Sequence, residues 1–191
     1  MKEIFTIGDS NYNIEYFLQL LIKNNIDCIV DVRSDPHANC PTEFNMENLN
    51  KTLDEYNIVY NYMGYEFGIT KTEENSYYEE ENSQFEKVEK NFNFLQGIER
   101  LKIGISMGYN IALMYSENDN FKYDYCITIG KILEKADFNV NHIMKNGACI
   151  HQKHIEGRFL QEIKETNIYN NCNKFNLLEE SYLRNIDFSA K

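Results

Sequence analysis

The feature that most constrains the fold of this chain is a repeated alternation of short apolar strands and amphipathic helices. Residues 3–7 are typical of a strand, and Asn13 can cap the helix that follows. The apolar positions of that helix recur at the spacing of one buried face, at Ile14, Phe17, Leu18 and Leu21. Strand–helix units of this length predict a mostly parallel sheet with right-handed crossovers and helices on both faces.

The pattern continues through most of the chain. Further strands are expected at residues 27–32, 58–63, 110–115 and 138–143. A helix capped by Asn45 should bury Met46, Leu49 and Leu53. Three later helices are expected, and their buried faces are Phe92, Leu95 and Ile98 in the first, Cys126, Ile129, Ile132 and Leu133 in the second, and Ile155, Phe159, Leu160 and Ile163 in the third. We therefore expect a single α/β, Rossmann-like domain over residues 1–165, followed by a polar C-terminal extension over residues 166–191.

Residues 64–90 interrupt the alternation with a strongly acidic composition. Eight Glu against three Lys give this segment a net charge of −5, out of −11 for the whole chain. A solvated acidic loop is the simplest interpretation, and a lid or a partner-binding insertion is the alternative. The overall negative charge argues against non-specific nucleic-acid binding, which needs clustered Lys and Arg.

Cysteine and histidine spacing gives no sign of a metal site or a disulfide framework. The five cysteines are odd in number and widely separated, and His151 and His154 have no third ligand at a supporting spacing. We expect reduced thiols, no metal and no cofactor. The chain has no apolar run long enough to span a membrane and no N-terminal stretch of signal-peptide type, so we expect a cytoplasmic protein without a membrane partner.

Polar residues follow three of the expected strands at their carboxyl ends. In open α/β sheets, ligands bind beyond these ends, so the three segments should meet at one edge. The segments are Gly8-Asp9-Ser10-Asn11, Arg33-Ser34-Asp35 and Tyr115-Ser116-Glu117.

Two of these positions have open alternatives. Asp9 either caps the turn or binds a ribose hydroxyl, an amine or a base edge, since a carboxylate repels phosphate. Arg33 is costly after an apolar strand unless it is paired. Its guanidinium either forms an ion pair with Asp31, Asp35 or Glu117, or grips a phosphate or carboxylate. Glu117 is also a candidate general base.

Several motifs occur in a specific order along the chain. They read Thr6-Ile7-Gly8-Asp9-Ser10-Asn11, Val30-Asp31-Val32-Arg33-Ser34 with Pro36, Phe44-Asn45 with Leu49, Gly97-Ile98-Glu99-Arg100-Leu101, Ala112-Leu113-Met114-Tyr115-Ser116-Glu117, and His142-Ile143 with Gly147. Over roughly residues 4 to 155 this order resembles the bacterial family of domain of unknown function 488 proteins. The resemblance implies the α/β fold but no activity.

The chain departs from the family pattern at its reactive positions. The family histidine after the first strand is Asp9 here, and the cysteine that ends the fourth strand is Tyr115. The family's Cys-His-Arg falls on Tyr123, Asp124 and Tyr125. A thiolate or imidazole mechanism cannot operate on these side chains. Aromatic rings can instead stack on a planar ligand, while carboxylates accept from its hydroxyls or amines.

These observations favour a non-catalytic binding protein for a nucleotide-like or phosphate-bearing small molecule, acting as a sensor or a sequestering protein, with a role in phage–host conflict as a conjecture. The ligand-binding positions are Gly8, Asp9, Ser10, Asn11, Arg33, Ser34, Tyr115, Ser116, Glu117, Tyr123, Asp124 and Tyr125. One alternative is a hydrolase of a nucleotide or glycosidic bond with Glu117 or Asp9 as the base. Another is a protein-interaction module that uses residues 64–90. Association with a second copy of the chain is left open.

Overall fold

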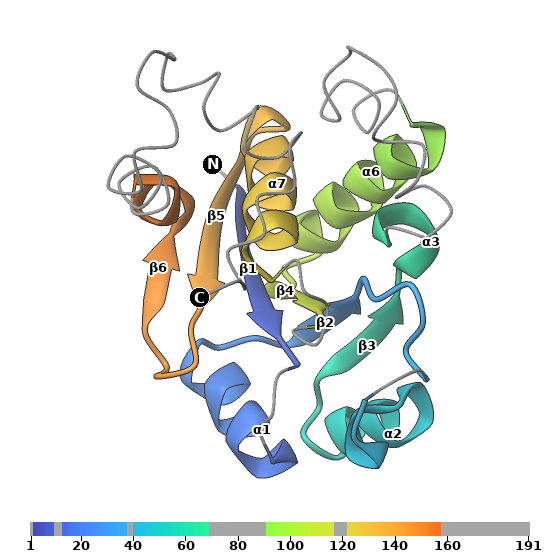
Figure 1. Ribbon diagram of the computed structural model, residues 1–191. Helices are drawn as coiled ribbons and strands as arrows, with labels where there is room; N and C mark the ends of the chain where they lie inside the picture. Colours follow the sequence, from blue (N-terminus) through green and yellow to red (C-terminus); the bar gives the residue numbers. More distant parts are fainter. Residues whose placement is uncertain (1, 10–12, 38–39, 69–90, 117–121, 158–191) are drawn as a thin grey trace, which may run out of the picture.

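Six strands form one sheet between two layers of helices in the computed structural model (Figure 1). The structure describes residues 2–9, 13–37, 40–68, 91–116 and 122–157, and for residues 122–128 it describes the backbone alone. Most of the acidic insertion and the whole C-terminal extension lie outside these residues. The elements are β1 (Lys2–Gly8), α1 (Ile14–Lys23), β2 (Cys28–Asp31), η1 (Thr42–Phe44), α2 (Met46–Glu55), β3 (Val59–Tyr62), α3 (Gly64–Phe67), α6 (Phe92–Ser106), β4 (Ile111–Tyr115), α7 (Lys122–Lys135), β5 (Phe138–Ile143) and β6 (Cys149–His151).

The strand order is β3-β2-β4-β1-β5-β6. All neighbouring pairs are parallel except β5 and β6, which are antiparallel. The α/β fold with a mostly parallel sheet is therefore confirmed. Strand β6 lies at one edge of the sheet and was not expected from the sequence, because three residues are too few to show a strand period.

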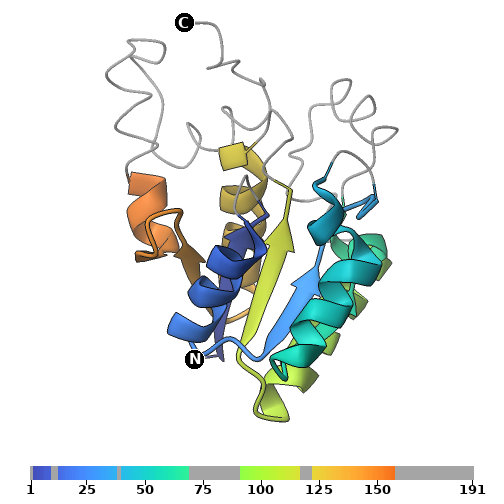
Figure 2. The ribbon, with the colours of Figure 1, turned by 90° about the horizontal axis from the view of Figure 1, so that it is seen from below.

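Alternation along the strands divides the core into two layers. Ile29, Ala112 and Met114 pack with α1 and α2 on one face of the sheet. Val30 and Leu113, their neighbours in sequence, pack with α6 and α7 on the other. Figure 2 shows the two helical layers on opposite sides of the strands. Burial on both faces explains why β2 and β4 have continuous apolar sequences.

Two helix starts follow the sequence prediction closely. The side chain of Asn13 accepts a hydrogen bond from the backbone N–H of Tyr16 at 2.9 Å, and α1 begins at Ile14, directly after this cap. The side chain of Asn45 likewise accepts from the backbone N–H of Asn48 at 2.9 Å, and α2 begins at Met46, directly after this cap. Each cap satisfies a donor that the first helical turn leaves without a partner.

The expected buried face of α6 is wrong in part. Phe92 is 70% exposed and Leu95 is 49% exposed, although Ile98 is buried as expected. The helix buries Phe94, Gly97, Ile98 and Leu101 instead. Gly97 explains the shift, because a Cβ there would press into the ring of Phe67. Close packing against α3 at a glycine thus sets the rotation of the helix, and the apolar spacing gave no sign of it.

A chain of polar side chains connects β1 and β5 to the segment after β6. His142 is 2% exposed, and its Nδ1 accepts from the hydroxyl of Thr6 at 2.8 Å. Its Nε2 donates to Oε1 of Gln152 at 2.6 Å, which assigns the proton to Nε2. Gln152 Nε2 in turn donates to Glu156 at 2.9 Å. Burial lowers the pKa of His142 to about 4, and the hydrogen bond with Gln152 offsets only part of this effect.

Neutral His142 predicts a loss of stability in mild acid. Below about pH 6.5 the unfolded chain takes up a proton at this ring, whereas the folded chain stays neutral down to about pH 4. The free energy of unfolding should therefore fall by about 3 kcal/mol as the pH falls from about 6.5 to about 4. Urea unfolding of His142→Gln from pH 4 to pH 7 should show a shallower pH dependence than the unaltered protein. His37→Gln, which alters an exposed ring, should keep the original slope; equal slopes for all three proteins would contradict the assignment.

Candidate functional site

Strands β1 and β4 lie side by side, yet their crossovers leave on opposite faces of the sheet. The connection after β1 passes through α1, whereas the connection after β4 passes through α7. In open α/β sheets, ligands bind at the carboxyl ends of neighbouring strands whose connections are reversed in this way. The backbone N–H of Asp9 donates to the carbonyl of Tyr115 at 2.9 Å, and that of Val32 donates to Met114 at 3.0 Å. The carboxyl ends of β1, β4 and β2 therefore lie side by side, as predicted, and we refer to this end of the sheet as the carboxyl edge.

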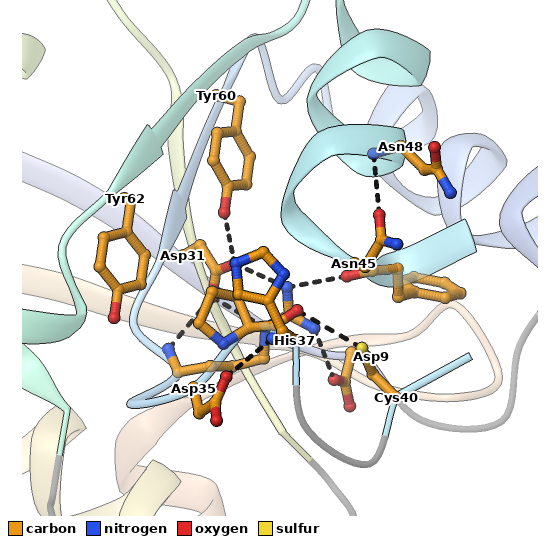
Figure 3. Close-up of polar contacts among 12 residues, drawn as sticks. Asp9, Asp31, Asp35, His37, Cys40, Asn45, Asn48, Tyr60 and Tyr62 are labelled. Atoms are coloured by element: carbon orange, nitrogen blue, oxygen red, sulfur yellow. Dashed lines mark hydrogen bonds and ion pairs between the residues drawn. The ribbon is translucent and has the colours of Figure 1, made fainter. Parts of the chain in front are cut away.

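Acceptors of the protein take four hydrogen bonds from the guanidinium of Arg33. Figure 3 shows two of the residues that accept them, Asp31 and Asp9, with the side chain of Tyr60 pointing toward Asp31. Its Nε donates to Oδ1 of Asp31 at 2.9 Å, and its Nη2 donates to Oδ2 of the same carboxylate at 2.6 Å. Nη2 also donates to the carbonyl of Phe44 at 2.9 Å, while Nη1 donates to Oδ2 of Asp9 at 3.2 Å. The ion pair, one of the two alternatives for Arg33, is thus present, with Asp9 as a partner that was not expected.

A tyrosine completes the cluster. The hydroxyl of Tyr60 on β3 donates to Oδ2 of Asp31 at 2.6 Å. Burial, and then the charge of Asp31, raise the pKa of Tyr60 above its ordinary value. Burial alone would lower the pKa of Arg33, but the hydrogen bonds and charge of Asp31, together with the charge of Asp9, outweigh it and raise that pKa. Arg33 is therefore charged, and Tyr60 stays protonated.

The sequence explains how the cluster forms. Asp31 and Arg33 are two residues apart in extended backbone, so both face the layer of α1 and α2. Residue Phe44 ends η1, and its ring packs edge-on against Phe17 at 5.2 Å between centroids. That contact fixes the carbonyl of Phe44 where Nη2 of Arg33 can reach it.

Close contacts with the end of β3 and the start of α3 line one side of this edge. The hydroxyl of Tyr62 donates to the carbonyl of Ser34 at 3.1 Å. Gly64 lies against the carbonyl of Arg33, and a Cβ at this position would overlap that oxygen. The side chains of Ser34 and Asp35 are exposed beside this contact, and the carboxylate of Asp35 accepts from the N–H of His37 at 3.0 Å.

The structure brings together part of the predicted set. Gly8, Asp9 and Arg33 are buried, Ser116 is half-buried, and Ser34 is exposed. The ring of Tyr115 packs with the cluster on the α6 and α7 face, across the sheet from Arg33. Ser10, Asn11 and Glu117 lie outside the described residues, as do the side chains of Tyr123, Asp124 and Tyr125, whose backbone belongs to α7. Contact of any of these residues with a ligand stays a prediction.

Two side chains of the cluster were absent from the predicted site. Asp31 was considered only as a possible partner of Arg33, although it contributes both carboxylate oxygens to the network. A charge inside an apolar strand needs a partner, and this was the available signal. Tyr60 gave no comparable signal, because a tyrosine in a strand at the edge of a sheet is ordinary.

The described residues include neither a membrane-spanning helix nor a cluster of metal ligands. None of the described helices is long and apolar enough to cross a bilayer. In the same part of the chain, no three His, Cys, Asp or Glu side chains gather closely enough to hold a metal ion.

Comparison with known proteins gives a family match without an activity. The family described as "Domain of unknown function DUF488" matches residues 13–122, which is more than half of the chain. No curated protein and no solved structure matches the chain. The matched range includes β2 with Arg33 and β4 with Tyr115.

The cluster predicts a large difference between buried and exposed ion pairs. Asp31→Asn leaves the Arg33 guanidinium buried with weakened pairing, so the free energy of unfolding should fall by about 3–5 kcal/mol. Lys102→Met removes the pair with the exposed Glu99 on α6, and it should lower the free energy of unfolding far less, because solvent screens such a pair. Urea unfolding at neutral pH measures both. Similar values for the two variants would show that the Asp31 contact has no special weight.

Proposed function

The chain belongs to the DUF488 family, and from that premise we propose that it binds a nucleotide-like small molecule at the carboxyl edge of β1, β4 and β2 without transforming it. The ligand contacts in this proposal are the positions expected from the sequence, residues 8–11, 33–34, 115–117 and 123–125. A sensor and a sequestering protein are the two roles that suit such binding. We assign it to the cytoplasm, where the cysteines Cys28, Cys40 and Cys149 stay reduced.

The observation that carries the proposal is the buried Arg33 cluster at this edge. The guanidinium of Arg33 is 5% exposed and pairs with two carboxylates. Removing these charges from water costs desolvation free energy that the ion pairs only partly offset. Packed apolar side chains would give equal or greater stability at lower desolvation cost. Charged clusters of this kind concentrate at functional sites, and this one lies where α/β sheets bind ligands.

The replaced family residues support binding over catalysis. In the resemblance to the family pattern, Asp9 replaces a histidine, and the Oδ2 of Asp9 accepts a hydrogen bond from Arg33. In the same resemblance, Tyr115 replaces a cysteine, and a tyrosine cannot supply a thiolate. A hydrolase would need Glu117 or Asp9 as its base, and turnover of the bound molecule is the result that would identify one.

Native mass spectrometry of the purified protein tests the proposal. The released molecule should be nucleotide-like, present in about equimolar amount, and recovered unchanged after long incubation. Ser34→Trp, which fills an exposed position at the edge, should remove at least about 90% of it, because a bulky ring blocks access without disturbing the core. Ser106→Trp is the matched control, since it makes the same change at an exposed position at the C-terminal end of α6.

Three results would contradict the proposal. A cleaved product that Glu117→Gln abolishes would favour the hydrolase. No released molecule, together with no thermal shift across a nucleotide panel, would favour the protein-interaction alternative. Equal retention of ligand by Ser34→Trp and Ser106→Trp would place the binding site elsewhere on the molecule.

A further inference from the structure

We propose that the outer face of α6 is an interface between two copies of this chain, in which the two α6 helices pack antiparallel across a twofold axis near Glu99. The interface is separate from the carboxyl edge and does not depend on the ligand proposed there. Three properties of α6 lead to it: an exposed apolar stripe, the symmetry of that stripe along the helix, and the charge of the helix.

Helix α6 has apolar residues on two opposite faces. Its inner face is buried in the core, and Figure 1 shows the helix next to α3. Successive residues of a helix are about 100° apart, so four large apolar residues fall on the opposite, outer face. We call these four residues the α6 stripe: Phe92, Leu95, Ile103 and Met107, which are 70%, 49%, 57% and 70% exposed. Apolar residues on both faces are typical of a helix that is covered on both, and the described residues cover only the inner one.

The area of the α6 stripe suits a reversible dimer. Four large side chains that are half exposed or more leave on the order of 500 Å² of apolar surface, which is toward the upper end of what a monomer exposes in one patch. Two such faces packed together bury on the order of 1,000 Å², close to the lower limit for a specific interface. A second copy therefore supplies enough area for association, and the small size predicts a Kd of about 10–100 μM.

The α6 stripe is symmetric about Glu99, which is why we assign a second copy as its partner. Leu95 and Ile103 lie four residues before and four residues after Glu99, and Phe92 and Met107 lie seven before and eight after it. A twofold axis at Glu99 therefore places Leu95 of one copy against Ile103 of the other, and Phe92 of one against Met107 of the other. An interface between identical faces must be complementary to its own reversed copy, whereas an unrelated partner requires no such symmetry.

The charge of α6 permits self-association. The chain carries a net charge of −11, so two copies repel each other over most faces. Glu99, Arg100 and Lys102 give α6 itself one negative and two positive charges, a net charge of +1. Lys102 Nζ donates to Oε1 of Glu99 at 2.8 Å. In the antiparallel arrangement each Glu99 also comes close to Lys102 of the second copy, so the two carboxylates at the axis are both paired with a cation.

Sedimentation equilibrium of the full chain over a range of concentrations tests the interface. The mass should rise from that of one chain toward twice that value, with a midpoint at about 10–100 μM. Leu95→Glu should weaken the dimer at least about tenfold, because it places a carboxylate against the apolar side chain of Ile103 of the second copy. Ile22→Glu, at a position 55% exposed on α1, is the matched control and should leave the midpoint unchanged.

A mixture of two variants tests the antiparallel register. Leu95→Glu and Ile103→Lys should each be monomeric alone at concentrations where the unaltered chain is dimeric. Mixed in equal amounts, they should form a dimer that holds one copy of each. In that dimer the introduced carboxylate faces the introduced ammonium group, and the unaltered Ile103 and Leu95 meet in the other half of the interface.

Several results would overturn the interface. One is a full chain that stays monomeric up to about 200 μM, beyond the range expected for so small an area. A monomer that Leu95→Glu destabilises toward urea more than Ile22→Glu would show that another segment of the same chain covers the α6 stripe, and equal stabilities would leave it to a different protein. A dimer that Leu95→Glu and Ile22→Glu weaken equally, or a mixture that stays monomeric, also overturns the interface.

Discussion

The interaction on which this edge of the molecule depends is the pairing of Arg33 with Asp31 and Asp9. A buried guanidinium must be matched by acceptors, and here they come from the strand ends β1 and β2 and from the carbonyl of Phe44. Segments far apart in sequence are thereby tied to one charged group. Because Asp9 also joins β1 to β4 through its N–H, the cluster and the sheet hold each other in register.

The position of this charged cluster in the fold makes it a candidate binding site. The crossovers of β1 and β4 lie on opposite faces of the sheet, and the charged groups lie at the carboxyl ends of these strands, where ligands bind in α/β sheets of this kind. Their net charge is negative although the central residue is an arginine. Electrostatic character therefore cannot be inferred from Arg33 alone, and the pairing geometry determines which ligand chemistry fits.

The sequence predicted the periodic parts of the structure and the meeting of the strand ends. Strand positions, the caps Asn13 and Asn45, and the convergence of the ends of β1, β2 and β4 followed from local rules. The rotation of α6 did not, since close packing at Gly97 set it. The partners of Arg33 were only partly predictable, because pairing between strands depends on tertiary geometry. The sequence alone therefore left an ion pair and a contact with phosphate as equal alternatives for Arg33.

The most direct test of the account is nuclear magnetic resonance of the isotopically labelled protein during titration with the best-binding molecule of the nucleotide panel. The account predicts that the largest shifts involve the amides of Asp9, Arg33, Ser34 and Ser116 and the Nε–H of Arg33, all at the carboxyl edge. The amides at the opposite end of the sheet, at the starts of β2 and β4, should stay in place. The largest shifts on the exposed face of α6, with the Arg33 Nε–H unchanged, would contradict the account.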